Sequence, residues 1–418
     1  MSYIHTYGKV SGISRIGDLL RQYMFPWLAF YAAEGTSSDK VLFITIASLV
    51  QAIPSLTLGN YSARLVRRFS PVTTTLWSNA GMGIISLTTA LAAYSDLCNK
   101  WVVMAAWFLV GCMEVIYYPS RDCLYRALAG KNDEARADAN RSAASIYHVG
   151  RALISVAMIG VVWILGPLAD EVPRTAIAAA LLIDAVTFAV AVAFVSSLKG
   201  VEQEAEEEVG AQQISLIAAA QVRGAFPIFL CILMLWAFAY SSFYFIFGFF
   251  QDLHGANPQE RQVSFYIAMF ASACGGFFGA KLWRLNLPSL ALGMVTVCLV
   301  EAGVALMPSD YFWGTVFAAA ISFVSILVYT TVFDGIIPQL VQGLDKNAEV
   351  SSAIAIVKEG LSPIIVVGLT GLASYLNAPR EVLVGACALS VVVVLVTLIT
   401  RKGAIEDVIR ASIAVKAE

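Results

Sequence analysis

Apolar stretches of about 20 residues recur along the whole chain, and they constrain the fold more than any other feature of the sequence. A helix of that length rises about 30 Å, which matches the hydrocarbon thickness of a bilayer. Hydrophobic residues make up 59% of the 418 residues and charged residues only 13%, about half the charged share of a typical soluble domain. A soluble chain of this length has too little interior to bury so much apolar surface. The sequence therefore predicts an all-α protein that crosses a membrane many times.

Twelve of these stretches are predicted to be transmembrane helices. They lie at residues 13–33, 41–62, 72–94, 101–118, 144–168, 175–198, 226–250, 262–280, 287–307, 312–333, 350–375 and 381–400. The first dozen residues are polar and lack the basic and apolar regions of a signal peptide, so we expect a cytoplasmic arm there. The seven cysteines are scattered without CxxC spacing, which indicates buried thiols rather than disulfides or a metal site.

The positions of lysine and arginine orient the chain in the membrane. With both termini on the cytoplasmic side, most of the 27 Lys and Arg residues lie in cytoplasmic segments. This asymmetry follows the positive-inside rule. The net charge of −2 also offers no basic surface for nucleic acid. The Lys and Arg residues in segments on the opposite side are Lys40, Lys100, Arg174, Arg261 and Arg380.

An acidic stretch at residues 199–224 divides the predicted helices into two sets of six. When the sequence is shifted by 207 residues, Asn140 aligns with Asn347 and Arg151 aligns with Lys358, which indicates an internal duplication. The chain is therefore predicted to form two pseudo-symmetric six-helix bundles joined by a cytoplasmic linker. The predicted parts are an N-terminal bundle at 1–198, the linker at 199–224 and a C-terminal bundle at 225–418.

Ionisable residues inside the predicted helices are the candidate functional residues. A charged side chain costs about 2.5–3.5 kcal/mol at the bilayer centre, so each must pair with an opposite charge or face water. A polar internal cavity would satisfy both conditions. Arg15, Asp18 and Arg21 follow i, i+3 spacing and share one helix face. The candidates for a substrate or proton pathway are Arg15, Asp18, Arg21, Glu114, Arg151, Lys358 and Glu359.

Three of these candidates share a predicted depth in the membrane. A rise of 1.5 Å per residue places Asp18, Glu114 and Arg151 about 6–10 Å from the inner ends of their helices. Burial favours the protonated form of a carboxyl group and a neighbouring arginine favours the ionised form, so Asp18 and Glu114 are candidates for proton coupling. The alternative for Arg15 is snorkelling to the membrane surface, and for Arg151 it is a bridge between helices. Asp184 in the sixth span is assigned a structural role.

Aromatic and small residues mark two further helix faces. Trp236, Tyr240 and Tyr244 recur on one face of the predicted seventh helix. They are candidate cavity aromatics for an aromatic or amphiphilic substrate, and lipid contact or helix packing is the alternative interpretation. In the eighth helix, Ala271, Gly275 and Gly279 form a small-residue face, which predicts close packing against another helix.

Twelve helices in two homologous halves around a cytoplasmic linker resemble the major facilitator superfamily. The finer resemblance is to the branch that contains the enterobactin exporter and macrolide efflux proteins. The loop after the second span departs from the superfamily pattern, because Ala63 and Arg67 stand at its glycine and aspartate positions. The Gly-Pro signature of antiporters is also missing from its usual place in the fifth span, where Ile154-Ser155 stand instead. The finer resemblance is carried by Gly17-Asp18, the EGTSS sequence at Glu34–Ser38, Tyr118-Pro119-Ser120-Arg121, Ala139-Asn140 and Leu182–Phe188.

The resemblance implies a secondary active transporter that works by alternating access and exports a siderophore or an amphiphilic drug-like compound. We expect a monomer in a bacterial inner membrane, with the lipid bilayer and a small-molecule substrate as its partners and a proton gradient in place of any cofactor. A lipid or metal-ion transporter of the same fold and a non-transporting receptor or scaffold are the alternatives. The lone His148 and the dispersed carboxylates form no recognisable set of metal ligands. The chain lacks HExxH, GxSxG and Walker A patterns, so no enzyme activity is expected.

Overall fold

The chain is almost entirely helical wherever its structure is described. The computed structural model describes residues 3–33, 37–95, 97–129, 133–165, 174–198, 226–227, 229–234, 253–279, 287–332, 354, 356–357, 361–376 and 378–414. Apart from helices, the regular structure within these ranges is one isolated β-bridge between His254 and Asp310. The predicted all-α fold is therefore confirmed.

The N-terminal part of the chain forms six long helices. They are α1 (Tyr3–Ala32), α2 (Ser37–Phe69), α3 (Pro71–Tyr94), α4 (Lys100–Ala129), α5 (Asp133–Leu165) and α6 (Arg174–Ser196). The predicted N-terminal arm is helical and forms the first part of α1, which begins at Tyr3. It is ordered by packing, because Ile4 and Tyr7 are buried in one apolar cluster with Val72 and Leu124.

The connection between α2 and α3 is much shorter than the sequence predicted. The segment expected to form a loop after the second span is instead the last part of α2, which ends at Phe69. Ser70 then reverses the chain with a φ of 68°, and its hydroxyl accepts a hydrogen bond from the backbone N–H of Thr73. Pro71 occupies the first helical position of α3, where a missing N–H costs nothing.

The C-terminal part of the chain contributes six more described helices. They are α9 (Pro258–Gly279), α10 (Leu287–Ala305), α11 (Tyr311–Tyr329), α14 (Ser362–Leu376), α15 (Pro379–Thr400) and α16 (Lys402–Ala414). The short helix α16 lies beyond the last predicted span and is amphipathic. Ile405 and Ile409 are buried on one face, and Glu406 forms ion pairs with Lys402 and Arg410 on the other.

Within the described ranges, six helical segments are long and apolar enough to cross a membrane. Two shorter apolar helices, Phe43–Gly59 and Ser362–Ala373, lie in two further predicted spans. In the predicted seventh span, residues 226–227 and 229–234 are the helical residues that the structure describes. The architecture is that of a multi-pass membrane protein. The six segments are Lys100–Ala129, Asp138–Ile164, Arg174–Ser196, Gln259–Gly279, Tyr311–Val332 and Arg380–Thr400.

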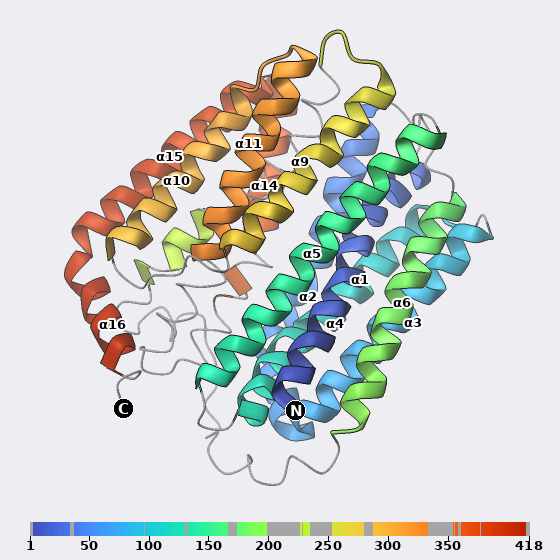
Figure 1. The fold of residues 1–418 in the computed structure, drawn as a ribbon, viewed down its shortest axis with the longest axis vertical. Helices are drawn as coiled ribbons and strands as arrows, with labels where there is room; N and C mark the ends of the chain where they lie inside the picture. Colours follow the sequence, from blue (N-terminus) through green and yellow to red (C-terminus); the bar gives the residue numbers. More distant parts are fainter. Residues whose placement is uncertain are drawn as a thin grey trace. The chain divides into compact units, whose positions relative to one another are not determined.

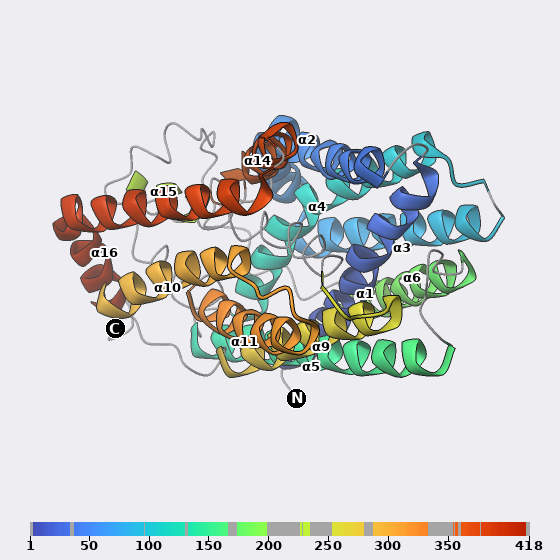
Figure 2. The same ribbon diagram turned by 90° about the horizontal axis from the view of Figure 1, so that it is seen from above.

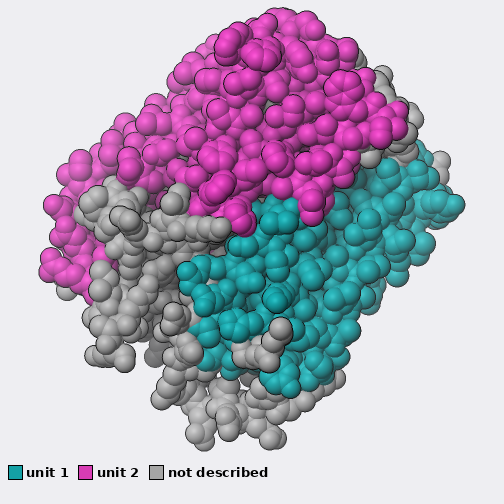
Figure 3. Space-filling view, viewed as in Figure 1, with its two compact units in different colours: residues 1–150, 170–213 teal, residues 151–169, 214–418 magenta. Residues whose placement is uncertain are grey.

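The chain divides into two compact units (Figure 3). Unit 1 consists of residues 1–150 and 170–213, and unit 2 consists of residues 151–169 and 214–418. The boundary falls inside α5, so the first part of this helix belongs to unit 1 and the second part to unit 2.

In unit 1, four helices surround a common core. α1 packs against α4 and α6, and α3 packs against the same two helices, so α1 and α3 lie diagonally across this core. The pair α3 and α6 runs side by side in both ribbon views (Figure 1 and Figure 2). α2 packs against α4 and also contacts α1 and α3. We call the space enclosed by α1, α3, α4 and α6 the four-helix core.

The helix pairs of unit 1 have counterparts in unit 2. α2 packs with α4 and α3 with α6 in unit 1, while α9 packs with α11 and α10 with α15 in unit 2. These are the second-with-fourth and third-with-sixth predicted helices of each half. A Cβ atom on Gly275 would lie 2.1 Å from the Phe323 carbonyl oxygen, and one on Gly279 would lie 2.4 Å from that of Leu327. The predicted close packing of this small-residue face is therefore confirmed, with α11 as the partner helix.

Candidate functional site

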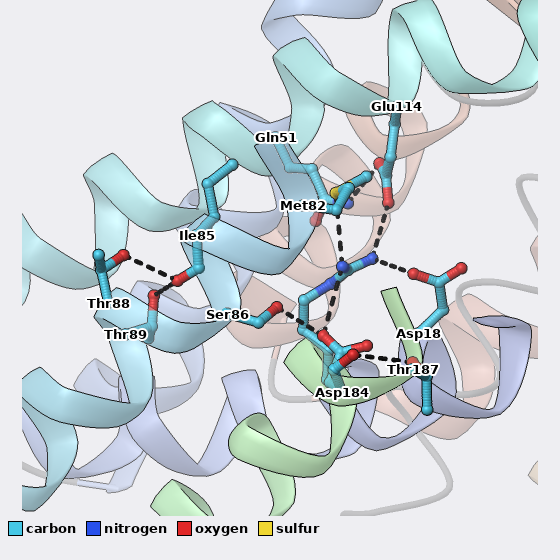
Figure 4. Close-up of polar contacts among 11 residues, drawn as sticks. Asp18, Gln51, Met82, Ile85, Ser86, Thr88, Thr89, Glu114, Asp184 and Thr187 are labelled. Carbon is cyan, nitrogen blue, oxygen red and sulfur yellow. Dashed lines mark hydrogen bonds and ion pairs between the residues drawn. The ribbon is translucent and has the colours of Figure 1, made fainter. Parts of the chain in front are cut away.

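A buried arginine and three carboxyl groups meet inside unit 1. Arg21 on α1 is 2% exposed, and its Nη2 atom lies 2.6 Å from Asp18 Oδ1 and 3.5 Å from Glu114 Oε1. Its Nη1 atom lies 3.6 Å from Asp184 Oδ2. The side chains of Asp18, Glu114 and Asp184 converge from α1, α4 and α6 (Figure 4). We call these four residues the Arg21 cluster.

Two neutral side chains pack against the guanidinium of Arg21. Its Nη1 atom donates to the Met82 sulfur at 3.5 Å. Its Cζ atom lies 5.7 Å from the centroid of the Phe188 ring, within the range of a cation–π contact. These contacts come from α3 and α6, so all four helices of the core supply groups to the site.

Glu114 and Asp184, the two carboxylates that come from helices other than α1, each accept a hydrogen bond from a neutral donor. The Gln51 amide on α2 donates to Glu114 Oε2 at 2.7 Å. The Ser86 hydroxyl on α3 donates to Asp184 Oδ2 at 2.5 Å. Hydrogen bonds to an ionised carboxylate are stronger than those between neutral groups, so these donors fix the positions of both acids.

Two glycines let the helices approach closely enough to build the cluster. A Cβ atom on Gly17 would lie 2.1 Å from Thr187 Oγ1 and 2.5 Å from Asp184 Oδ1, so a larger residue would push α1 away from α6. A Cβ atom on Gly111 would lie 2.1 Å from the Gln51 carbonyl oxygen, so the same argument holds for α4 and α2. Glycine at these positions therefore brings the acidic side chains to the arginine.

The charges in direct contact within the cluster are unbalanced. One guanidinium faces three carboxyl groups, and full ionisation would leave an excess of two negative charges in a protein core. Such an excess of like charge is costly to bury. The side chains of Asp18 and Glu114 are 16% and 14% exposed, whereas that of Asp184 is fully buried. Asp18 and Glu114 are thus the two partly exposed acids of the cluster.

The structure brings three of the predicted pathway residues together. Asp18 and Arg21, predicted to share one face of this helix with Arg15, form an ion pair. Glu114, predicted at a similar depth from the rise of its helix, reaches the same guanidinium. The Arg21 cluster is therefore partly anticipated by the sequence.

Two other predicted pathway residues, Arg15 and Arg151, have described contacts of their own. The guanidinium of Arg15 lies over the ring of Tyr147, 4.7 Å from its centroid. Arg151 belongs to unit 2, where its Nη2 atom is 3.4 Å from the sulfur of Met269. Five predicted site residues fall outside the residues that the structure describes: Trp236, Tyr240, Tyr244, Lys358 and Glu359.

Asp184 is the member of the cluster that the sequence did not assign to the pathway. It was recognised as a charge inside an apolar span but was given a structural role. A carboxylate at membrane depth needs a partner, and the hydroxyl-rich α3 is the helix that supplies one through Ser86. Gln51 had no such signal, because it is uncharged and the candidates were chosen among ionisable residues.

The cluster is a network of ion pairs. Over the ranges that the structure describes, no group of three or more His, Cys, Asp or Glu residues is arranged to hold a metal ion. The three carboxyl groups instead share a guanidinium, whose five N–H donors can serve several acceptors at once.

Solved structures share the fold of this chain, although neither a protein-family model nor a curated protein sequence matches it. FucP, a major facilitator superfamily transporter crystallised in the outward conformation, is 14% identical with a TM-score of 0.64, over 96% of this chain and 99% of that chain. Another structure of FucP, the fucose:proton symporter of E. coli, is 14% identical with a TM-score of 0.62, over the same shares of both chains. The nucleoside transporter NupG is 11% identical with a TM-score of 0.63, over 94% of this chain and 99% of that chain. The predicted major facilitator fold is therefore confirmed.

Proposed function

We propose that this protein is a secondary active transporter that couples the movement of a small organic molecule to proton binding at the Arg21 cluster. The observation that supports the proposal is a set of four ionisable side chains in the core of a helix bundle with the major facilitator fold. A buried ion-pair network of this kind is often no more stable than well-packed apolar residues. Ionisable residues inside membrane helices commonly mark proton or substrate pathways.

Protonation of the cluster would change how the helices of unit 1 are linked. Arg21 connects α1 to α4 through Glu114 and connects α1 to α6 through Asp184. A proton on Glu114 removes the charge that holds α1 to α4, while the buried Asp184 and its Ser86 donor keep the arginine against α6. The cluster would then act as a proton-dependent link between α1 and α4, which is the kind of change that alternating access requires.

For the substrate, we propose a siderophore or an amphiphilic drug-like compound, moved outward. This proposal depends on the sequence resemblance to exporters and on the basic residues predicted along the pathway, whose charge suits a carboxylate or catecholate. The predicted lining consists of Arg15, Arg151, Lys358 and Glu359 with the aromatic residues Trp236, Tyr240 and Tyr244. Uptake of a polar solute with protons is the second candidate, because FucP of the same fold is a fucose:proton symporter.

We place the protein in a bacterial inner membrane as a monomer with both termini cytoplasmic. The support for this orientation is the excess of lysine and arginine in the segments that would then face the cytoplasm. In this orientation, the end of unit 1 that carries the N-terminus of α1 faces the cytoplasm.

The test is flux into proteoliposomes that contain the purified full chain and an imposed proton gradient. The probes are a metal-free catecholate siderophore, ethidium and fucose, each with the acidic side inside or outside. Export coupled to proton entry predicts accumulation of the siderophore or ethidium when the cytoplasmic face is outside and the lumen is acidic. Fucose accumulation driven by external acid favours the symport candidate instead, and flux that is indifferent to the gradient contradicts proton coupling.

Matched variants test whether the loss of gradient-driven flux is specific to the Arg21 cluster or follows from removing any carboxylate. Asp18→Asn is expected to abolish the response to the gradient while retaining substrate exchange across the membrane. Asp138→Asn is the control, because Asp138 forms the same i, i+3 ion pair with Arg141 but on an exposed part of α5. Equal loss of gradient-driven flux in both variants contradicts a specific role of the Arg21 cluster.

A further inference from the structure

The four-helix core of unit 1 contains an unusual concentration of buried polar atoms without partners. Ten buried side-chain N or O atoms make no hydrogen bond of acceptable geometry with any described residue, and six of them lie on the helices of this core. Leaving six polar groups unpaired would cost a free energy comparable to the whole stability of a domain. The six atoms are Ser11 Oγ, Ser14 Oγ, Thr75 Oγ1, Asn79 Oδ1, Tyr125 Oη and Asp184 Oδ1.

On α1, the unpartnered hydroxyls share a face with the Arg21 cluster. Ser11, Ser14, Asp18 and Arg21 are separated by three, four and three residues, which places them along one side of a helix. Ser11 and Ser14 are 4% and 1% exposed. This side of α1 therefore presents hydroxyls to the core on the N-terminal side of the ion pairs.

On α3, the pattern is the same. Thr75, Asn79, Met82 and Ser86 are separated by four, three and four residues, and the last two contact Arg21 and Asp184. Thr75 and Asn79 are fully buried or nearly so. The unpartnered atoms of α3 thus lie on the face that looks toward the cluster.

The polar faces of α1 and α3 extend along the same length of the core, beside α4. At one end, Tyr7, Val72 and Tyr125 pack in one apolar cluster, and at the other end Arg21 and Ser86 lie at the ion pairs. Fourteen residues separate the ends on both α1 and α3, which is about 21 Å of helix. The unpartnered hydroxyls and amide therefore occupy the same stretch of the core.

Along this stretch, polar side chains of α1 and α4 lie close together. Ser11 lies within hydrogen-bonding reach of Tyr125, and Ser14 lies within reach of Tyr117. Polar groups as close as these can also share a bridging water.

We propose that a file of bound water molecules occupies the four-helix core between Tyr125 and Asp184 and carries protons to and from the Arg21 cluster. Each water can satisfy two to four polar atoms, so a few molecules would pair all six oxygens. The proton-carrying part of this proposal depends on the proposed function, whereas the presence of the water does not.

Proton movement along such a file conserves every bond. A water accepts a proton from its neighbour, forming one O–H bond, and gives up another proton on its far side, breaking one O–H bond. The last transfer forms the O–H bond of a carboxylic acid on Asp18 or Glu114, the two partly exposed acids of the cluster. The guanidinium of Arg121 lies 5.8 Å from the centroid of the Tyr117 ring, and its positive charge opposes an excess proton in this part of the core. The file therefore conducts toward the cluster only when a carboxylate there is ionised.

The presence of water is tested by X-ray hydroxyl-radical footprinting of the full chain in nanodiscs. Radicals form from bound water and modify side chains beside it, even when these are buried. We expect Tyr125 and Met82 to be modified several-fold faster than Phe25 and Trp107, which are equally buried and pack edge to face with each other. Equal, background rates at all four residues overturn the proposal.

Two threonines on α3 provide a matched pair of variants. Thr75 Oγ1 is unpartnered, whereas Thr89 Oγ1 donates to the Ile85 carbonyl of its own helix, and both residues are buried. Thr75→Val is expected to lower the modification of Tyr125 several-fold, and Thr89→Val to leave it unchanged. In proteoliposomes, Thr75→Val is expected to slow gradient-driven flux several-fold while leaving substrate exchange at equal pH unchanged.

The thermal midpoint of Thr75→Val distinguishes a hydrated site from a dry one. A methyl group in place of a dry, unpaired hydroxyl raises the midpoint, whereas the same change at a water-bonded hydroxyl lowers it or leaves it unchanged. A raised midpoint together with unchanged labelling overturns the water file. If labelling shows water but flux ignores the proton gradient in every variant, the proposed proton coupling fails and the water site remains.

Discussion

Replacing Arg21 by methionine tests the electrostatic account of the cluster most directly. The substitution keeps an unbranched apolar side chain in the core but leaves Asp18, Glu114 and Asp184 facing one another without a cation. Removing one partner of a buried ion pair costs about 3–5 kcal/mol. At about 2–4 °C per kcal/mol for a unit of this size, the thermal midpoint should fall by roughly 6–20 °C near neutral pH.

The same variant should show a distinctive dependence on pH. Without Arg21, the folded core can relieve the repulsion among its carboxylates by binding protons that the unfolded chain releases. The folded state then holds more protons than the unfolded state, so the free energy of unfolding falls as the pH rises. Each extra proton contributes a slope of about 1.4 kcal/mol per pH unit. The deficit of the variant should therefore be larger at pH 8 than at pH 5.

The measurement is intrinsic tryptophan fluorescence during thermal unfolding in detergent, repeated across this pH range. Arg141→Met is the control, because it removes an exposed i, i+3 ion pair on α5 whose net contribution is about 0–1 kcal/mol. A small, pH-independent change in Arg21→Met, indistinguishable from that in the control, would refute the charge balance inferred for the cluster.

Three further predictions concern packing and thiol reactivity. Gly111→Val should lower the free energy of unfolding by about 1–3 kcal/mol because its Cβ atom meets the Gln51 carbonyl oxygen, whereas Gly160→Val, which has open space around it, should change it little in thermal unfolding. Burial raises the pKa of the Cys98 thiol to about 11, so little thiolate exists at pH 8. Maleimide labelling of Cys98, measured by mass spectrometry, should therefore be roughly 100-fold slower than labelling of an exposed thiol at pH 8, and its rate should keep rising until the pH reaches the pKa of the thiol. Ile405→Asp should forfeit about 1.5–3 kcal/mol of apolar burial and release α16 from the protein, which limited proteolysis should detect as faster C-terminal cleavage; unchanged proteolysis would contradict this packing.

The helices themselves were predictable because the bilayer imposes a length on every apolar stretch. α3, α6 and α15 begin and end within two residues of the predicted spans. The errors occur where packing among helices, rather than membrane thickness, decides the ends of a helix. The first turns of α1 are polar in sequence, but Ile4 and Tyr7 bury against α3 and α4 and extend the helix.

The part of the Arg21 cluster that lies on a single helix was likewise predictable from the sequence. Asp18 and Arg21 are one turn apart on the same helix, so spacing alone predicts their contact. Asp184 contacts Arg21 only because α1 and α6 approach closely at Gly17. This approach is a feature of the tertiary structure, which residue spacing does not predict. A single sequence shows that Asp184 needs a partner but does not show which of the buried cations in the other spans it will find.

The unpaired oxygens of the core could not have been predicted at all. Serine and threonine in a membrane helix ordinarily bond to a carbonyl of their own helix, as Thr89 does. Thr75 has the same residue type on the same helix and buries its hydroxyl without that bond. Only the arrangement of the surrounding helices distinguishes the two.

The stability and the function of the cluster can be separated by comparing a broken network with a neutral one. Arg21→Met alone leaves three acids unpaired, but the same change combined with Asp18→Asn, Glu114→Gln and Asp184→Asn leaves no charge to neutralise. Replacing a whole buried ionic network by neutral groups of similar size is often tolerated, so the combined variant should recover most of the stability that the single variant loses. It should nevertheless show no response to a proton gradient, because no group remains that changes its charge. A combined variant that still responds to the gradient would place proton coupling outside the Arg21 cluster, and one as unstable as Arg21→Met would show that the arginine acts by packing rather than by charge.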